Sequence, residues 1–386
     1  MDNIAAQTTD SSSIASSRTV TYTFSSESVS EGHPDKVCDY IADSILDAYL
    51  EQDSRSRVGC EVMCKNGTVV LGGEIKSKGR VDHELVVREA IREIGYTDPA
   101  TAFNADGVRV LQIISSQSPD IARGVDQDKN QNHEQGAGDQ GIMFGYATDE
   151  TDSLMPLPLV LAHELTKGLA QDRRLGQYEW ICPDAKSQVS VLYENNVPAS
   201  VTDVLVSTQH SAEVKRDDIV AHVRNVLAPR ALGKWFHPNI RFTVNPTGSF
   251  ILGGPSADCG VTGRKIIADT YGGAARHGGG AFSGKDPSKV DRSAAYFCRY
   301  VARQIVKNGL ATKVEIQVAY AIGVAKPMSV KVETFGTGDS SAAAEFVCGY
   351  DFRPAAIIER LNLLRPIYRL TTNYGHFGKK ELPWEQ

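Results

Sequence analysis

One short segment combines residue types that bind phosphate groups and metal ions. Residues 278–292 contain glycines together with Lys285, Lys289, Asp286 and Asp291. Glycine lets backbone N–H groups approach a polyphosphate closely, and lysine adds positive charge. Aspartate repels phosphate unless a hard cation lies between them, and Mg²⁺ uses carboxylates together with phosphate oxygens. The segment is therefore a candidate site for a phosphate ligand with a metal ion.

Two other interpretations of this segment are open. Gly279, Gly284 and Lys285 match the first part of a nucleotide-binding P-loop, but Asp286 occupies the place of the Ser or Thr that contacts Mg²⁺. Glycine-rich stretches are also common as flexible loops without a ligand. A mere linker needs neither two lysines nor two aspartates, so a ligand site is favoured.

A second polar cluster lies at the start of a predicted helix. Pro34 suits the first helical position. A buried stripe is predicted at four-residue spacing: Val37, Ile41, Ile45 and Tyr49. His33, Asp35 and Lys36 are expected at an exposed helix start, with donors that face an anion and with Asp35 able to hold a metal. Ordinary helix capping is the alternative.

A predicted hairpin carries a pair of carboxylates. Asn66-Gly67 is a strong signal for a two-residue turn between antiparallel strands. In that register Glu61 lies opposite Gly72, and Glu61 and Glu74 are diagonal neighbours on one face. They could hold a cation or a ligand ammonium, and a solvated sheet face is the alternative.

A long polar stretch at 118–138 is expected to act as a lid, because long loops in compact chains are often lids or disordered segments. Gln117 and Asp139 bracket it, and both are candidates for its ligand side.

Length and composition limit the possible classes of protein. The chain has 386 residues, enough for two or three domains, with ordinary proportions of 41% hydrophobic and 23% charged residues. A net charge of −6 argues against a general nucleic-acid binder, and no apolar run reaches the roughly 18 residues of a membrane helix. Seven cysteines without a CxxC pair indicate reduced cytosolic thiols. Strand pairs that alternate with helices predict α+β layers.

Three motifs, in this order, resemble the S-adenosylmethionine synthetase (methionine adenosyltransferase) family. They are GHPDK at 32–36, GAGDQG at 136–141 and GGGAFSGKD at 278–286. The resemblance extends from about Phe24 to Trp384. It implies that ATP and L-methionine are joined into S-adenosylmethionine, and that the bound triphosphate is then hydrolysed to phosphate and pyrophosphate. It also implies two Mg²⁺ ions per site and K⁺.

The resemblance further implies the roles of individual residues. ATP would contact His33, Asp184, Lys186, Ser249, Phe250, Asp258, Arg264, Lys265, Ala281 and Lys285. Catalysis would depend on His33, Asp139, Lys186, Arg264 and Lys285. Methionine would be held by Glu74, Gln117, Asp258 and Lys289. The Mg²⁺ ligands would be Asp35 and Asp291, and the K⁺ ligand would be Glu61.

The implied fold is α+β, with three similar domains of helix and sheet layers related by pseudo-threefold symmetry. The division would be a disordered tail at 1–19, domains at 20–121, 139–253 and 254–386, and a mobile active-site loop at 122–138. Flat sheets would pack at a subunit interface. The protein would be a cytoplasmic dimer or dimer of dimers with shared active sites.

The reaction suits this set of residues, because the thioether sulfur of methionine is itself the nucleophile. Catalysis then depends on alignment and on stabilising the triphosphate, and it needs no activated Ser, Cys or Lys. One departure stands out: Ser249 replaces the arginine that the family usually has before Phe250. It motivates a rival hypothesis, a catalytically weak regulatory subunit that binds nucleotide.

Overall fold

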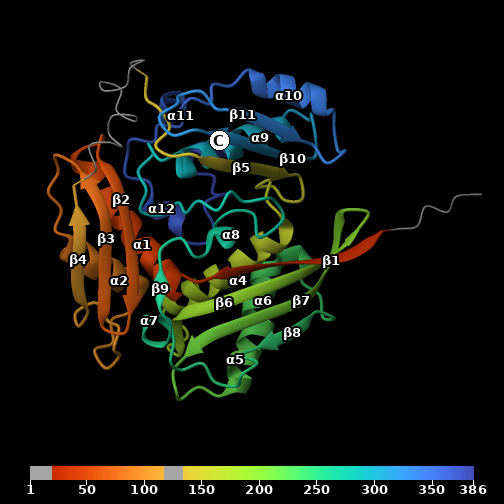
Figure 1. The fold of residues 1–386 in the computed structure, drawn as a ribbon. Coiled ribbons are helices and arrows are strands. Elements are labelled where there is room, and N and C mark those ends of the chain that lie inside the picture. The colour runs from red at the N-terminus through yellow and green to blue at the C-terminus, as the bar shows by residue number, and fades with distance from the viewer. Residues whose placement is uncertain (1–19, 117–133) are drawn as a thin grey trace, which may run out of the picture.

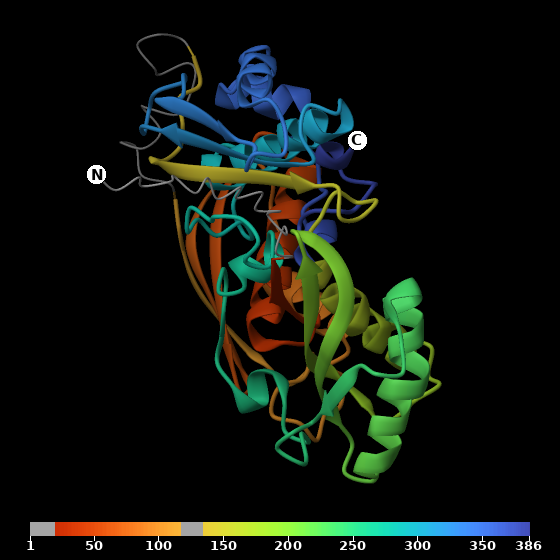
Figure 2. The same ribbon diagram turned by 90° about the vertical axis from the view of Figure 1, so that its right-hand side faces the viewer.

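The computed structural model describes residues 20–116 and 134–386. The expected tail at 1–19, Gln117 and most of the expected loop at 122–138 lie outside the described residues. The described chain forms three sheets, each with helices on one face (Figures 1 and 2).

The three sheets combine strands that are distant in the sequence. The first has the order β4 (Arg109–Ser115), β3 (Thr68–Lys76), β2 (Arg57–Lys65) and β9 (Gly260–Val261). The second has the order β1 (Thr21–Val29), β6 (Ile181–Glu194), β7 (Val197–His210) and β8 (Arg241–Val244). The third has the order β11 (Ser329–Glu333), β10 (Lys313–Tyr320) and β5 (Gly141–Thr148). Through β1, β5 and β9, the sheets interleave segments that a linear division of the chain would separate.

Helices bury the inner face of each sheet. The first sheet is covered by α1 (Pro34–Gln52) and α2 (His83–Ile94). The second is covered by α4 (Leu157–Arg174), α5 (Arg216–His222), η1 (Val223–Leu227), α6 (Ala228–Leu232) and η2 (Gly233–Trp235). The third packs on α9 (Val290–Lys307), beside α10 (Ser340–Cys348) and α11 (Pro354–Arg360). Short helices complete the chain: α7 (Gly254–Ala257), α8 (Ile266–Asp269), α12 (Arg369–Thr372) and η3 (Pro383–Glu385).

Helix α1 lies where the three sheets and their helices meet, and it contacts β2, α2, β9 and α12 (Figure 1). The predicted apolar stripe of this helix is confirmed, since Val37, Ile41, Ile45 and Tyr49 are all buried in the larger core. This position allows one helix to touch segments from both ends of the chain.

The predicted hairpin is also confirmed. Lys65 pairs with Thr68, and Glu61 lies opposite Gly72. Asn66 has φ 48°, the left-handed conformation that its turn requires. The sequence therefore places both carboxylates of this hairpin on the outer face of the first sheet.

Three open sheets with helices layered on them make this an α+β fold, as the sequence predicts. In residues 20–116 and 134–386, no helix is long and apolar enough to span a membrane.

Candidate active site

The start of α1 carries a neutral histidine. His33 is the N-cap of the helix, and its Nδ1 accepts the backbone N–H of Asp35 at 3.1 Å. Burial, together with the charges of Lys265 and Lys186, lowers the pKa of His33 to about 3. Because Nδ1 accepts a hydrogen bond, the proton of the neutral ring is on Nε2. His33 can thus offer a neutral N–H donor to an anion.

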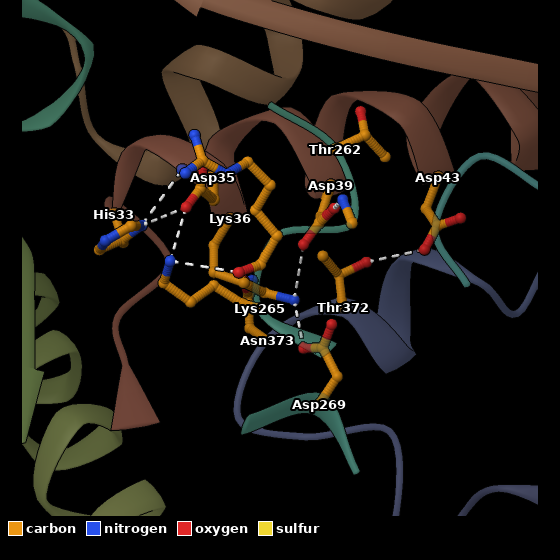
Figure 3. Close-up of polar contacts among 12 residues, drawn as sticks. His33, Asp35, Lys36, Asp39, Asp43, Thr262, Lys265, Asp269, Thr372 and Asn373 are labelled. Atoms are coloured by element: carbon orange, nitrogen blue, oxygen red, sulfur yellow. Dashed lines mark hydrogen bonds and ion pairs between the residues drawn. The ribbon is translucent and has the colours of Figure 1, made fainter. Parts of the chain in front are cut away.

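The prediction that this helix start is exposed is wrong. His33, Asp35 and Lys36 are only 4%, 4% and 2% exposed. Strand β9 and the residues that follow it pack over the first turn of α1 (Figure 3). The sequence does not reveal this, because the covering segment lies more than 200 residues further along the chain.

Asp35 links α1 to this covering segment. One carboxylate oxygen accepts the N–H of Val261 at 2.9 Å, and the other is 2.6 Å from Nζ of Lys265. Burial acts to raise the pKa of Asp35, but these two hydrogen bonds outweigh it and lower the pKa. Asp35 is therefore a charged carboxylate beside a lysine, an arrangement that suits a metal ion carried on a phosphate ligand.

Lys36 does not face a ligand. Its ammonium lies 3.1 Å from Asp39 and 2.6 Å from Asp269, inside the protein. Figure 3 shows it pointing away from His33, between α1 and α8.

A second group of charges lies along the edge of β2. The segment that contains Lys285 forms a bridge to Gly59, and Cys60 donates its N–H to the carbonyl of Gly284 at 3.0 Å. Nζ of Lys285 is 2.6 Å from Asp291, in the first turn of α9. Partial burial raises the pKa of Glu61, and Lys285 opposes that rise through its charge.

The glycines of this segment have different roles. A Cβ on Gly284, which has φ +80°, would lie 1.9 Å from the carbonyl oxygen of Cys60. A Cβ on Gly280 would lie 2.4 Å from Asp291. Gly279 has φ +92° with open space around it, so it alone of these three is free to admit a close ligand.

Gly284→Ala is therefore expected to destabilise the fold more than Gly279→Ala, the matched control. Both substitutions carry the strain of a positive φ, of order 1–3 kcal/mol, but only the first adds a backbone collision. Urea unfolding of the two variants measures the difference. Equal losses would contradict the packing role of Gly284.

Lys289 already has a partner in the structure. It forms an ion pair with Asp286, a buried aspartate that also accepts the N–H of Val58 at 2.8 Å. The sequence left the role of Asp286 unassigned, and its neighbours show that it holds Lys289 and β2 together.

Two of the residues expected to contact ATP, Asp184 and Lys186, lie near the start of β6. Asp184 is buried, and its Oδ2 accepts the N–H of Gly254 at 2.8 Å. Its Oδ1 has no hydrogen-bond partner among the described residues. Lys186 is exposed two residues further along the strand. Asp184 therefore keeps one buried acceptor, Oδ1, without a partner among the described residues.

Burial raises the pKa of Asp184 to about 6, so it binds its proton more tightly in the folded chain than in the unfolded chain. The stability that this proton contributes is complete below about pH 4 and is lost as the pH rises through about 6. We expect the stability of Asp184→Asn to rise relative to wild type by about 1–3 kcal/mol between pH 4 and pH 6. Urea unfolding at several pH values measures this, and a pH-independent difference would contradict it.

Phe250 is held by His210, a histidine that was not among the expected site residues. His210 donates its backbone N–H to the carbonyl of Phe250 at 3.0 Å, and its Nε2 accepts the N–H of Phe250 at 3.0 Å. Ser249, beside it, is exposed.

The structure brings some of the expected site residues together more closely than others. His33, Asp35, Lys186 and Lys265 interact at the start of α1. Ala281 connects this group to the glycine segment, since a Cβ on Gly263 would lie 2.4 Å from the Ala281 side chain. The remaining expected residues in the described ranges are exposed: Glu74, Asp139, Asp258 and Arg264.

The described residues contain no cluster of three or more His, Cys, Asp or Glu side chains that could bind a metal alone. Asp35 and Asp291 each contribute a single carboxylate, and each lies beside a lysine. This fits Mg²⁺ that arrives with phosphate oxygens as its other ligands, rather than a metal held entirely by protein.

A row of aspartates on α1, Asp35 apart, was not among the expected site residues. Asp35, Asp39, Asp43 and Asp47 follow each other at four-residue spacing, so they share one face of the helix. They accept backbone N–H groups from the C-terminal part of the chain: Val261, Gly263, Gly284, Tyr368 and Arg369. The spacing was visible in the sequence, but the partners were not.

Comparisons with known proteins cover nearly the whole chain. The N-terminal, central and C-terminal domain models of S-adenosylmethionine synthetase match residues 21–119, 134–250 and 252–386. A protein of Sorangium cellulosum named S-adenosylmethionine synthase is 53% identical, over 95% of this chain and 87% of its own length. One of Akkermansia muciniphila with the same name is 54% identical over 96% of both chains. The chain belongs to the S-adenosylmethionine synthetase family.

Proposed function

We propose that this chain is an S-adenosylmethionine synthetase, a methionine adenosyltransferase. The observation that carries the proposal is identity above 50%, over nearly the full length, with proteins named S-adenosylmethionine synthase. The matched region contains both charged groups of the candidate active site. Its substrates would be ATP and L-methionine.

The reaction is a single displacement followed by a hydrolysis. The sulfur of methionine attacks C5′ of ATP, the S–C bond forms as the C–O bond breaks, and triphosphate leaves with the bonding electrons. Water then cleaves the triphosphate to phosphate and pyrophosphate. Both steps gain from groups held in line and from fixed positive charge near the phosphates.

Five residues are proposed to act on the triphosphate and its cleavage: His33, Asp139, Lys186, Arg264 and Lys285. The neutral Nε2–H of His33 would donate to a phosphate oxygen, and the cations would stabilise the charge that develops on the leaving group. Asp184, Ser249, Phe250, Asp258, Lys265 and Ala281 complete the proposed ATP contacts. Asp184 would accept a hydrogen bond through its free Oδ1.

The proposed metal ions are Mg²⁺ at Asp35 and Asp291, two per site, and K⁺ at Glu61. When bound, the cations would neutralise phosphate charge. Lys265 and Lys285 now lie against the two aspartates. Each aspartate would exchange its lysine for a metal, and each lysine would become free to contact phosphate.

Methionine is proposed to lie between Glu74, Gln117, Asp258 and Lys289. Its ammonium requires acidic partners and its carboxylate requires a basic one. Lys289 can provide the base with little further loss of side-chain entropy, because Asp286 already fixes its position.

The protein is proposed to self-associate as a dimer or dimer of dimers with shared active sites. The outer face of the first sheet exposes Met63, Leu111 and Ile113. The cross-strand register places Ile113 in one row with Gly72 and Glu61, so apolar surface and a proposed ligand residue share this face. Exposed apolar side chains that gather on one face are typical of an interface. The domain division expected from the sequence and a cytoplasmic location belong to the same proposal.

Ile113→Lys is expected to convert the assembly to monomers, because it places a charge on the outer face of the edge strand β4, at a side chain that is 72% exposed and that an interface would bury. Light scattering coupled to size-exclusion chromatography measures the mass. Leu175→Lys, a similarly exposed apolar residue beyond the end of α4, is the matched control and should leave the mass unchanged. An unchanged mass for Ile113→Lys would place the interface elsewhere.

The direct test of the activity is to incubate the protein alone with ATP, L-methionine, Mg²⁺ and K⁺ and to detect S-adenosylmethionine by mass spectrometry. Steady production is expected. Saturable ATP binding without turnover would instead support the regulatory-subunit hypothesis that Ser249 suggests. ATP hydrolysis without the sulfonium product would indicate a nucleotide hydrolase.

A further inference from the structure

Lys36 is a buried cation to which the proposed mechanism assigns no role. It is 2% exposed, and its ammonium lies between Asp39 on its own helix and Asp269 at the end of α8 (Figure 3). Burial alone would lower the pKa of Lys36, but the two carboxylates outweigh it and raise the pKa. The side chain is therefore charged and fixed in place.

These contacts hold the segment that carries Arg264 and Lys265. At one end of the segment, Asp39 accepts the N–H of Gly263 at 2.8 Å. At the other end, Lys36 binds the side chain of Asp269 at 2.6 Å. Arg264 and Lys265 lie between these two anchors. Their backbone is thus fixed to the helix that carries His33 and Asp35.

A purely stabilising role explains this cluster poorly. Buried ion pairs contribute little net stability compared with apolar side chains of similar size, because the charges lose their hydration. The cluster also has two carboxylates for one ammonium, an unfavourable balance for stability alone. The cluster does have a clear geometric effect. It fixes the backbone of Arg264 and Lys265 relative to the helix start that carries His33 and Asp35.

We infer that Lys36, with Asp39 and Asp269, is a positioning group that places Arg264 and Lys265 for contact with the triphosphate of ATP. This inference rests on the proposed function. Lys36 itself touches no substrate. It acts through the backbone of residues 263–269, and misplacement of charged groups by about 1 Å is enough to weaken such contacts strongly.

The test uses the double variant Lys36→Gln/Asp269→Asn, which removes one positive and one negative charge and keeps the net charge of the cluster. Two measurements are made below the unfolding temperature of every variant: the dissociation constant of tripolyphosphate by calorimetry, and KM for ATP and for methionine. The expected result is an increase of about tenfold in the dissociation constant and in KM for ATP. KM for methionine should change less than twofold.

The matched control is Arg299→Gln/Glu385→Gln, which removes an equally buried ion pair of 2.8 Å between α9 and the C-terminal end. It should lower the melting temperature but leave the tripolyphosphate dissociation constant unchanged. Asp39→Asn, which weakens the anchor at Gly263, provides a second test if the double variant does not fold.

Wild-type affinity for tripolyphosphate in Lys36→Gln/Asp269→Asn would overturn the positioning role, and so would an equal loss of affinity in the Arg299→Gln/Glu385→Gln control. Failure of the wild-type protein to bind tripolyphosphate would also overturn it. Failure of the proposed function looks different: wild type would bind tripolyphosphate, and the variant would bind it more weakly, but no S-adenosylmethionine would form.

Discussion

Replacing Lys285 with alanine is expected to lower kcat/KM for S-adenosylmethionine synthesis by about 100- to 1000-fold. The substitution removes a positive charge that is proposed to stabilise the triphosphate leaving group, and groups of this kind contribute on that scale. The fold should remain intact, because other residues hold the segment. Cys60 donates its backbone N–H to the carbonyl of Gly284, and Asp43 accepts the N–H of Gly284 at 2.9 Å. Lys285 itself contacts Asp291 near the surface.

Initial rates at varied ATP and methionine, together with thermal unfolding, test this expectation. Lys215→Ala is the matched control, because Lys215 is an exposed lysine just before α5, on the far side of the second sheet. Its activity should equal that of wild type. Asp291→Ala should behave like Lys285→Ala. Loss of folding in either site variant, or retention of full activity, would contradict the role assigned to this segment.

The largest expected effect on stability is that of Arg292→Met, a loss of about 3–5 kcal/mol in the free energy of unfolding. Arg292 donates to both carboxylate oxygens of Asp43, at 2.7 and 2.8 Å, and both side chains are 0% exposed. Removing the arginine leaves a buried carboxylate without its charge partner, which is far more costly than losing a surface pair. Arg292 also donates to the carbonyl of Lys285 at 3.0 Å.

Urea unfolding measures the loss, with Arg241→Ala as the control. Arg241 forms an exposed ion pair with Asp203 on the second sheet, and its removal should leave the unfolding midpoint close to that of wild type. A double variant, Arg292→Met/Asp43→Asn, should recover part of the stability by removing the unpaired charge. If Arg292→Met were as stable as the control, the Asp43–Arg292 pair would not be what joins α1 to α9.

Local features of the fold could be predicted from the sequence. The Asn66-Gly67 turn and the strand alternation around it determine the register that places Glu61 opposite Gly72. The stripe on α1 also follows from spacing alone. These features depend on residues close together in the chain, where turn chemistry and helical periodicity act directly.

The contacts that build the site could not be predicted in this way. Asp35 meets Lys265, and Asp43 meets Arg292, across more than 200 residues. No local pattern indicates which of many lysines and arginines each aspartate binds. The family resemblance indicated candidate residues, but not that Lys36 turns inward to Asp269. Strands β1, β5 and β9 each pair with strands that are distant in the sequence, and no local pattern predicts those pairings either.

In the proposed reaction sulfur, and not water, attacks C5′ of ATP, and water attacks only the triphosphate. The most direct measurement is a reaction in H₂¹⁸O with ATP, L-methionine, Mg²⁺ and K⁺, in which all products are quantified by mass spectrometry. Equal yields of S-adenosylmethionine, phosphate and pyrophosphate are expected. The ¹⁸O should appear only in the phosphate products. Labelled adenosine, or phosphate released without S-adenosylmethionine, would contradict this mechanism.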